Sequence, residues 1–225
     1  MTSTTVTPRQ APRRRRTIPV VLGATALVVT GAVAFGVHTA RELRSETTSV
    51  SFSGVRELSV DIDEGRVALR RAAGAALEIT TTRSWRPGYE PTTQRTFAGG
   101  VVTLTADCAD FNLGCETVQE IAVPAGTAVR VRTVDGTITA SDLDTPRFSA
   151  TAVAGVVDAS FSRAPDAVAV ETTSGAVRVA LPPASYRISA DAVMGAVRIA
   201  VPSDPAAQRT VSAETVAGAI EVTPR

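Results

Sequence analysis

The sequence predicts an all-β protein: a β-solenoid-like stack of strand–turn–strand repeats, each of ~20 residues, that follows a single N-terminal transmembrane helix. One glycine-centred motif occurs five times, and its glycines are separated by 19, 20, 20 and 23 residues. Apolar residues occupy every second position on both sides of these glycines, which is the pattern of a strand with one buried face. An uncharged segment of 20 residues near the N-terminus is long enough to cross a bilayer.

The first element is a short basic tail, residues 1–17, which contains the run RRRR. We place the transmembrane helix at residues 18–38, because ~20 helical residues span the ~30 Å hydrocarbon core of a bilayer. Arginines before this helix and mixed charges after it place the N-terminus in the cytoplasm and the remaining chain outside the membrane. A cleaved secretory signal, with AVA at residues 32–34 as the cleavage site, is the alternative. Both interpretations export the rest of the chain.

The exported part is expected to comprise a stalk over residues 39–49 and one extracytoplasmic β-repeat domain over residues 50–225. Beyond residue 40 the chain carries 18 arginines and 22 acidic residues, so this part is mildly acidic. Nucleic acids attract basic surfaces through their phosphates. We therefore expect no nucleic-acid partner.

The two cysteines, Cys108 and Cys115, flank six residues in the sequence CADFNLGC. Two cysteines in an exported domain most simply form a disulfide. A metal site would need further Cys or His ligands, and the single histidine, His38, lies at the predicted membrane boundary. We expect a structural disulfide, no metal and no cofactor.

The repeats show where strands and turns alternate. Around Gly136, the apolar positions are Val129 and Val131 before the glycine, and Ile138 and Ala140 after it. The apolar phase therefore changes from odd to even numbers at the glycine, which places a turn there. Glycine supplies the backbone freedom that a sharp turn needs. The predicted turn glycines are Gly65, Gly136, Gly155, Gly175, Gly195 and Gly218.

Prolines mark the opposite corner of the repeats, where a missing amide donor does least harm. One repeat is too small to bury its own apolar face, so neighbouring repeats must stack, with the last one, around Gly218, expected at the end of the stack. The same phase also fits consecutive two-residue hairpins with Thr133 opposite Ile138. That arrangement would give an antiparallel β-sandwich or meander. We favour the solenoid because the repeats are evenly spaced.

The N-terminal half of the exported domain carries a looser version of the repeat around Gly65. The segment RSWRPGYEPTTQRTFAGG interrupts the alternation and predicts the longest irregular stretch. Aromatic residues together with arginines on a loop are typical of binding surfaces. An alternative role is a cap that shields edge strands at the end of the stack. The possible interaction patch consists of Trp85, Arg86, Tyr89, Arg95 and Phe97.

Catalysis is not expected. Nucleophilic catalysis needs a base near the nucleophile, usually histidine, and the exported domain has none. Paired carboxylates that could cleave a polysaccharide occur near turns, at Asp61, Asp63 and Glu64 and again at Asp142 and Asp144. Acidic residues at turns are usually solvated, and no pair stands out. We assign no catalytic residue.

The chain resembles the putative-adhesin family of β-strand-repeat proteins of unknown function over about residues 50–225. The resemblance lies in FSGVRELSVDIDEGRVAL, in IAVPAGTAVRVRTVDGTITAS and in the recurring Thr-x-x-Gly-x-Val units. The cysteine pair before VPAG is similar to that of many actinobacterial, membrane-anchored members. The resemblance implies a β-solenoid-like fold, a role at the cell surface and no catalytic residues.

Together these features predict a membrane-anchored cell-envelope protein whose non-catalytic β-repeat domain serves adhesion or interaction with a protein or glycan. The expected partners are the membrane, through the N-terminal helix, and an envelope protein or glycan. Two alternatives are a sensor or regulator subunit for envelope stress and a polysaccharide-active β-helix enzyme. The short tail has no room for a folded signalling module, which counts against direct signalling.

Overall fold

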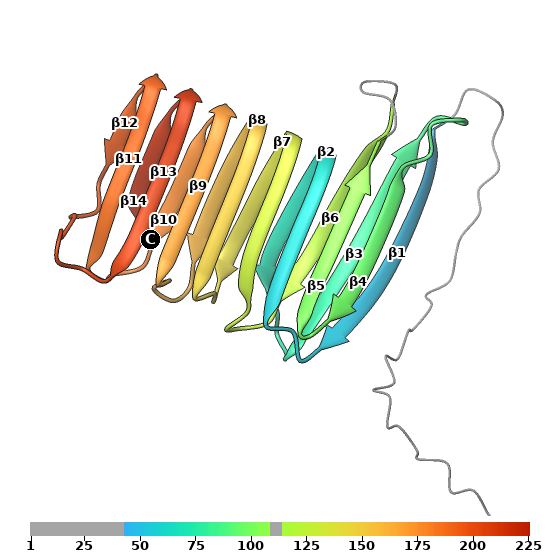
Figure 1. Ribbon diagram of the computed structural model, residues 1–225, viewed down its shortest axis with the longest axis horizontal. Coiled ribbons are helices and arrows are strands. Elements are labelled where there is room, and N and C mark those ends of the chain that lie inside the picture. Colours follow the sequence, from blue (N-terminus) through green and yellow to red (C-terminus); the bar gives the residue numbers. More distant parts are fainter. Residues whose placement is uncertain (1–42, 109–113) are drawn as a thin grey trace, which may run out of the picture.

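The computed structural model of the protein describes residues 43–108 and 114–225, which form 14 β-strands in one hydrogen-bonded set (Figure 1). This described part is all-β, as predicted, and contains no helix. Accordingly, none of its segments is a helix with the length and hydropathy needed to span a bilayer. The predicted cytoplasmic tail (1–17) and transmembrane helix (18–38) lie outside the described residues.

The strands of the N-terminal half are β1 (Arg44–Ser53), β2 (Glu57–Arg71), β3 (Ala76–Trp85), β4 (Thr92–Ala98), β5 (Val101–Asp107) and β6 (Glu116–Val123). The remaining strands are β7 (Ala128–Leu143), β8 (Arg147–Phe161), β9 (Ala167–Ser174), β10 (Val177–Leu181), β11 (Tyr186–Met194), β12 (Val197–Ile199), β13 (Arg209–Ala217) and β14 (Ile220–Pro224). Strands β2, β7 and β8 have 15, 16 and 15 residues, and each has a glycine at its middle.

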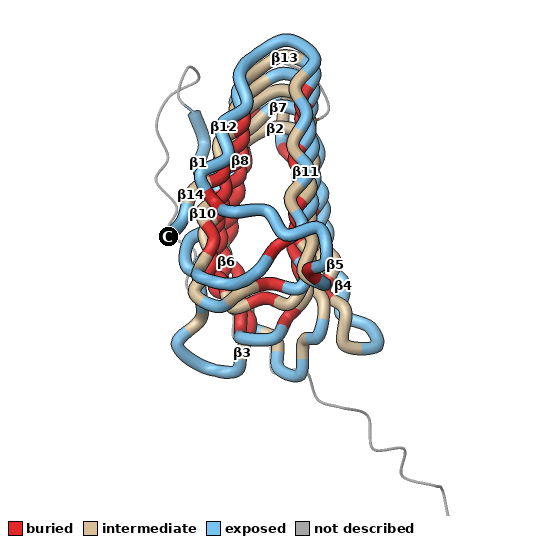
Figure 2. Tube along the Cα trace, turned by 90° about the vertical axis from the view of Figure 1, so that its left-hand side faces the viewer, coloured by how far each residue is buried: buried red, intermediate tan, exposed pale blue. Residues whose placement is uncertain are grey.

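The strands build two walls that face each other (Figure 2). Wall 1 has the order β1-β3-β6-β2-β7-β8-β10-β14-β12, and wall 2 has the order β4-β5-β2-β7-β8-β9-β13-β11. The long strands contribute one half to each wall: β2 pairs with β5 up to Ile62 and with β6 from Gly65 onward. A strand in wall 2, the following glycine turn and the strand in wall 1 form one rung, which we name after its glycine.

Successive repeats pair in parallel, with equivalent residues in register. Gly136 lies opposite Gly155, and the same ladder pairs Thr133 with Ala152 and Ile138 with Val157. The hairpin alternative, in which Thr133 faces Ile138 across an antiparallel pair, is therefore wrong for the repeats. Antiparallel pairing is confined to the N-terminal end of the described part, between β1 and β3, β3 and β6, and β4 and β5.

The core lies between the two walls and follows the apolar phase of the sequence. Val131 and Ala150 from wall 2 and Ile138 and Val157 from wall 1 are each at most 1% exposed. Small β-branched side chains and alanines allow the walls to approach closely, and the core is filled without large aromatic clusters. Figure 2 shows the buried residues as two facing columns, which join the rungs into one continuous core.

The glycine turns form a column in which each rung touches the next through backbone. Gly175 has φ = +152°, a conformation that side chains rarely adopt. A Cβ atom at this position would lie 1.6 Å from the carbonyl oxygen of Gly155. The backbone conformation and the lack of space therefore both require glycine, and the same contact recurs from rung to rung.

The order of the last two rungs differs from the expectation that the Gly218 repeat ends the stack. Strand β14 pairs with β10 on one side and with β12 on the other, and β13 lies between β9 and β11. The Gly218 rung is thus inserted between the Gly175 and Gly195 rungs, and the Gly195 rung (residues 186–199) closes the stack (Figure 1).

Charges on the outer face of wall 1 favour this order. In the observed stack, residues at one register position alternate in charge along the wall, and Arg198 lies 3.7 Å from Glu221. The ladder consists of Asp158, Arg178, Glu221 and Arg198. Stacking in chain order would place the two arginines beside each other, and like charges on neighbouring strands are destabilising.

Two predictions about the N-terminal half were wrong. Residues 44–49, expected in the stalk, belong to β1, where Ser and Thr hydroxyls pair with those of β3, such as Thr47 with Thr82 at 3.0 Å. The segment expected to be irregular contains the end of β3 and the whole of β4. Strands β1 and β4 are the edge strands of the two walls, so polar residues replace the apolar alternation that marks an inner rung.

Candidate interaction surfaces

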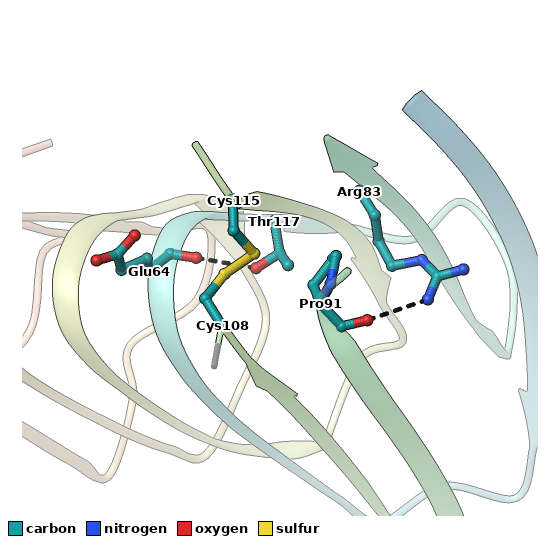
Figure 3. The surroundings of a disulfide bond; sticks show 6 residues. All are labelled: Glu64, Arg83, Pro91, Cys108, Cys115 and Thr117. Carbon is teal, nitrogen blue, oxygen red and sulfur yellow. Dashed lines mark hydrogen bonds between the residues drawn. A yellow bond between two sulfur atoms is a disulfide. The ribbon is translucent and has the colours of Figure 1, made fainter. Parts of the chain in front are cut away.

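The predicted interaction patch lies at the N-terminal end of the stack, where β1 and β4 are the outermost strands of the two walls. Trp85 ends β3 and is only 9% exposed. The guanidinium of Arg83 lies 5.5 Å from the centre of the Trp85 ring and forms an ion pair with Glu46 of β1. It also donates a hydrogen bond to the carbonyl oxygen of Pro91 at 3.3 Å (Figure 3). Trp85 is therefore part of the packed end of the stack.

Arg95 and Phe97 of β4 connect wall 2 to β1 in wall 1. Arg95 is half-buried and donates a hydrogen bond to the Thr48 hydroxyl at 2.8 Å. Burial lowers the pKa of Arg95, as does the positive charge of Arg83, although the guanidinium stays charged at physiological pH. Phe97 packs against Phe52, with ring centres 5.6 Å apart. These contacts close the N-terminal end between the two walls, which is the geometry of a cap.

Arg86 and Tyr89 are not brought into this cap. Both lie in the turn between β3 and β4, where the amide of Tyr89 donates to the carbonyl of Arg86 at 3.0 Å. Arg86 is exposed and Tyr89 is partly buried. The five residues proposed as one patch therefore divide into a structural cap and an exposed turn.

The predicted disulfide is present and joins the end of β5 to the start of β6. The Cα atoms of Cys108 and Cys115 are 5.9 Å apart. Two residues later, the Thr117 hydroxyl donates to the carbonyl oxygen of Glu64 at 2.9 Å (Figure 3). The disulfide thus holds the start of β6 beside the Gly65 turn, which is a structural role.

The carboxylates considered for catalysis lie in two separate places, at the Gly65 turn and at the proline side of the stack. Burial and the neighbouring Asp107 carboxyl raise the pKa of Asp63. Asp142 has φ = +56° and forms an ion pair with Arg225, which fixes the C-terminal strand to the proline side of the stack. No group of three or more His, Cys, Asp or Glu residues in the described chain is arranged to hold a metal ion. Asp63 therefore lies close to other carboxylates, whereas Asp142 is paired with an arginine.

The C-terminal end of the stack carries a surface that sequence reasoning missed. Val197 and Ile199 of the Gly195 rung are 42% and 43% exposed, whereas the equivalent residues of the next rung, Ile220 and Val222, are 1% and 0% exposed. Val193 and Met194 at the adjoining turn are exposed as well. The sequence contains no local sign of this surface, because Val197 and Ile199 occupy inward positions of an ordinary repeat.

Comparisons with known proteins bear on the fold. No protein-family model matches the chain, and no curated protein matches its sequence. Among solved structures, a putative cell adhesion protein from Clostridium sporogenes matches with a TM-score of 0.58 and 15% identity, over 82% of this chain and 100% of that chain. The two proteins share a fold. A putative adhesin from Bacteroides fragilis matches with a TM-score of 0.36 and 10% identity, over 84% of this chain and 100% of that chain.

Proposed function

We propose that the protein is a membrane-anchored cell-envelope protein whose β-repeat domain is a β-solenoid that serves adhesion or interaction with an envelope protein or glycan. The observation that carries this proposal is the fold shared with the putative cell adhesion protein from Clostridium sporogenes. The resemblance to actinobacterial, membrane-anchored members of the putative-adhesin family agrees with it. The uncharged segment at residues 18–37, preceded by RRRR, supports the anchor and its orientation.

The outer faces of the walls support an interaction role rather than a catalytic one. Because neighbouring rungs pair in parallel and in register, equivalent exposed side chains recur along each wall at ~4.8 Å, the spacing of neighbouring strands. On wall 2 this places Glu171, Glu214 and Asp191 in one line. Such a surface presents the same group many times, which suits contact with an extended partner.

A fractionation experiment tests the anchor. Full-length protein with a C-terminal tag is expected to pellet with membranes, to resist carbonate extraction, and to lose its tag when protease is added to intact cells. The positive-inside rule and the length of the apolar segment are the reasons. Release into the medium, with a new N-terminus near Phe35, would show that the segment is a cleaved signal.

A second experiment separates binding from catalysis. If the domain serves binding alone, purified full-length protein should leave cell-wall glycan intact. Turnover of the glycan that disappears in the double variant Asp61→Asn/Asp63→Asn would instead identify a polysaccharide-active enzyme. The matched control is Asp142→Asn/Asp144→Asn, at the opposite corner of the repeats.

A further inference from the structure

The uncovered part of the Gly195 rung is the half next to its glycine turn. Toward the proline corner, residues 200–208 cross the end of the stack (Figure 2). There the amide of Asp204 donates to the carbonyl of Tyr186 at 2.8 Å, and the amide of Ile188 donates to the Ser203 hydroxyl at 3.0 Å. Beyond Ile188, β11 pairs only with β13 and β12 only with β14 among the described strands. Both strands therefore present a free edge.

The peptide groups on these two edges are in complementary phase. The amide of Ile188 points away from β13, so the peptide groups of Ala190 and Ala192 point to the free edge of β11 by alternation. On β12, the residues on either side of Val197 and Ile199 bond to β14, so the peptide groups of Val197 and Ile199 point to the free edge. Unpaired edges of this kind are templates for another strand.

We propose that a second copy of this chain covers this surface, with β11 of each copy pairing antiparallel to β12 of the other about a two-fold axis parallel to the strands. Rotation about this axis places wall 1 of one copy beside wall 2 of the other, and each residue keeps its position along the strand direction. Ala192 then lies opposite Val197 of the second copy, and Ala190 lies opposite Ile199. All four residues have inward side chains and free peptide groups, so the two cores become continuous across the junction.

The charges on the outer face select this pairing. The same register places Asp191 opposite Arg198 of the second copy, and symmetry repeats the pair on the other wall. The two residues face each other at a non-hydrogen-bonded position, where side chains on antiparallel strands are closest. Pairing β11 with β11 over the same free residues would oppose Asp191 with itself, and pairing β12 with β12 would oppose Arg198 with itself. Only the β11–β12 arrangement joins opposite charges on both walls.

The consequence for function rests on the proposed membrane anchor. Strand β1 begins at one end of the stack, and the Gly195 rung lies at the other (Figure 1). A two-fold contact between the Gly195 rungs therefore places the two β1 strands at opposite ends of the dimer. This separation leaves room for the two copies to be anchored in facing membranes, and the surface would then serve homophilic adhesion.

Two charge reversals test the pairing by complementation. In a dimer of full-length Asp191→Arg, two arginines would face each other at each junction between the copies. In a dimer of Arg198→Asp, two aspartates would face each other there. Each variant should self-associate on the order of tenfold more weakly than wild type, in detergent micelles followed by sedimentation. A mixture of the two variants restores both opposite-charge pairs and should form dimers as wild type does. Glu214→Arg, at the equivalent position of the inner Gly218 rung, should leave dimerisation unchanged.

The same proteins are then placed in vesicles of phosphatidylethanolamine and phosphatidylglycerol, with clustering followed by light scattering. Wild-type vesicles should cluster, vesicles with either variant alone should not, and mixing the two variant populations should restore clustering. A wild-type chain that is monomeric in micelles, or a mixture no better than either variant, overturns the pairing. Complementation in micelles without clustering of vesicles supports the pairing and contradicts the proposed anchor arrangement.

Discussion

Replacing Gly175 by valine tests the column of glycine turns, on which the repeat architecture depends. The turn holds Gly175 at φ = +152°, with room for no Cβ atom because the carbonyl oxygen of Gly155 lies only 1.6 Å from its position. The rung must therefore move away from its neighbour. That movement strains the hydrogen bonds from the Gly175 amide to the Ala217 carbonyl and from the Val157 amide to the Ala176 carbonyl, both 2.9 Å long.

The expected loss of stability combines two effects. Strain in a sparsely populated backbone conformation costs about 1–3 kcal/mol. Each weakened backbone hydrogen bond costs about 0.5–1.5 kcal/mol. Together they predict a loss of about 2–6 kcal/mol. This is a large fraction of the stability of an ordinary domain, which is about 5–15 kcal/mol.

Urea unfolding of the β-repeat domain, with its disulfide intact, measures this loss. The exposed control Arg178→Thr should stay within about 1 kcal/mol of wild type, since it removes only surface charge contacts. Gly218→Val should be as damaging as Gly175→Val, because the Gly218 rung is an interior layer whose Cβ atom would meet the carbonyl of Gly175 at 1.7 Å. Coincident unfolding of all three variants with wild type would refute the argument that these glycines are obligatory turns.

Three further changes test local features of the stack. Burial and a neighbouring carboxyl raise the pKa of Asp63, so the stability that its protonated form contributes is lost as pH rises from the ordinary pKa of 3.8 through the raised pKa. Asp63→Asn should therefore stabilise the domain at neutral pH but not in acid, as urea midpoints at the two pH values would show. Removing the disulfide with Cys108→Ser/Cys115→Ser should cost about 2–3 kcal/mol for its short loop, and equal midpoints would exclude a stabilising role. Thr172→Val leaves its buried partner Thr215, 2.9 Å away, without that hydrogen bond and should cost about 1–3 kcal/mol, whereas the double variant with Thr215→Val should recover most of the loss in calorimetry.

The parts of the fold that depend on one repeat could be predicted from the sequence. The change of apolar phase at Gly136 reflects a turn that any single rung must make, so strand positions and inward residues followed directly. The order of the rungs could not be predicted in the same way. Val177 can pair as well with Val197 as with Ile220, because both are inward apolar residues at the same register position. Outer-face charges favour one of the two orders, and they become neighbours only in the folded stack.

The cap at the N-terminal end was only partly predictable. An edge strand has a neighbour on one side alone, so β1 alternates Ser and Thr with a few apolar residues and does not show the pattern of an inner rung. Trp85 and Phe97 were recognisable as unusual in a chain poor in aromatic residues, but their partners, Arg83 and Phe52, come from other strands. Only the folded arrangement shows that Trp85 is packed against Arg83, whereas Phe97 contacts Phe52 and stays 42% exposed.

The insertion of the Gly218 rung has a consequence for the order in which a growing chain can fold. Layers up to the Gly175 rung can be added as each repeat emerges, because each pairs with one that has already been made. The Gly195 rung cannot take its final position when it emerges, since its neighbours in the finished stack are β13 and β14, which follow it in the chain. Until these strands are made, it must wait unpaired or occupy the place that belongs to the Gly218 repeat, so residues 209–224 complete two layers at once.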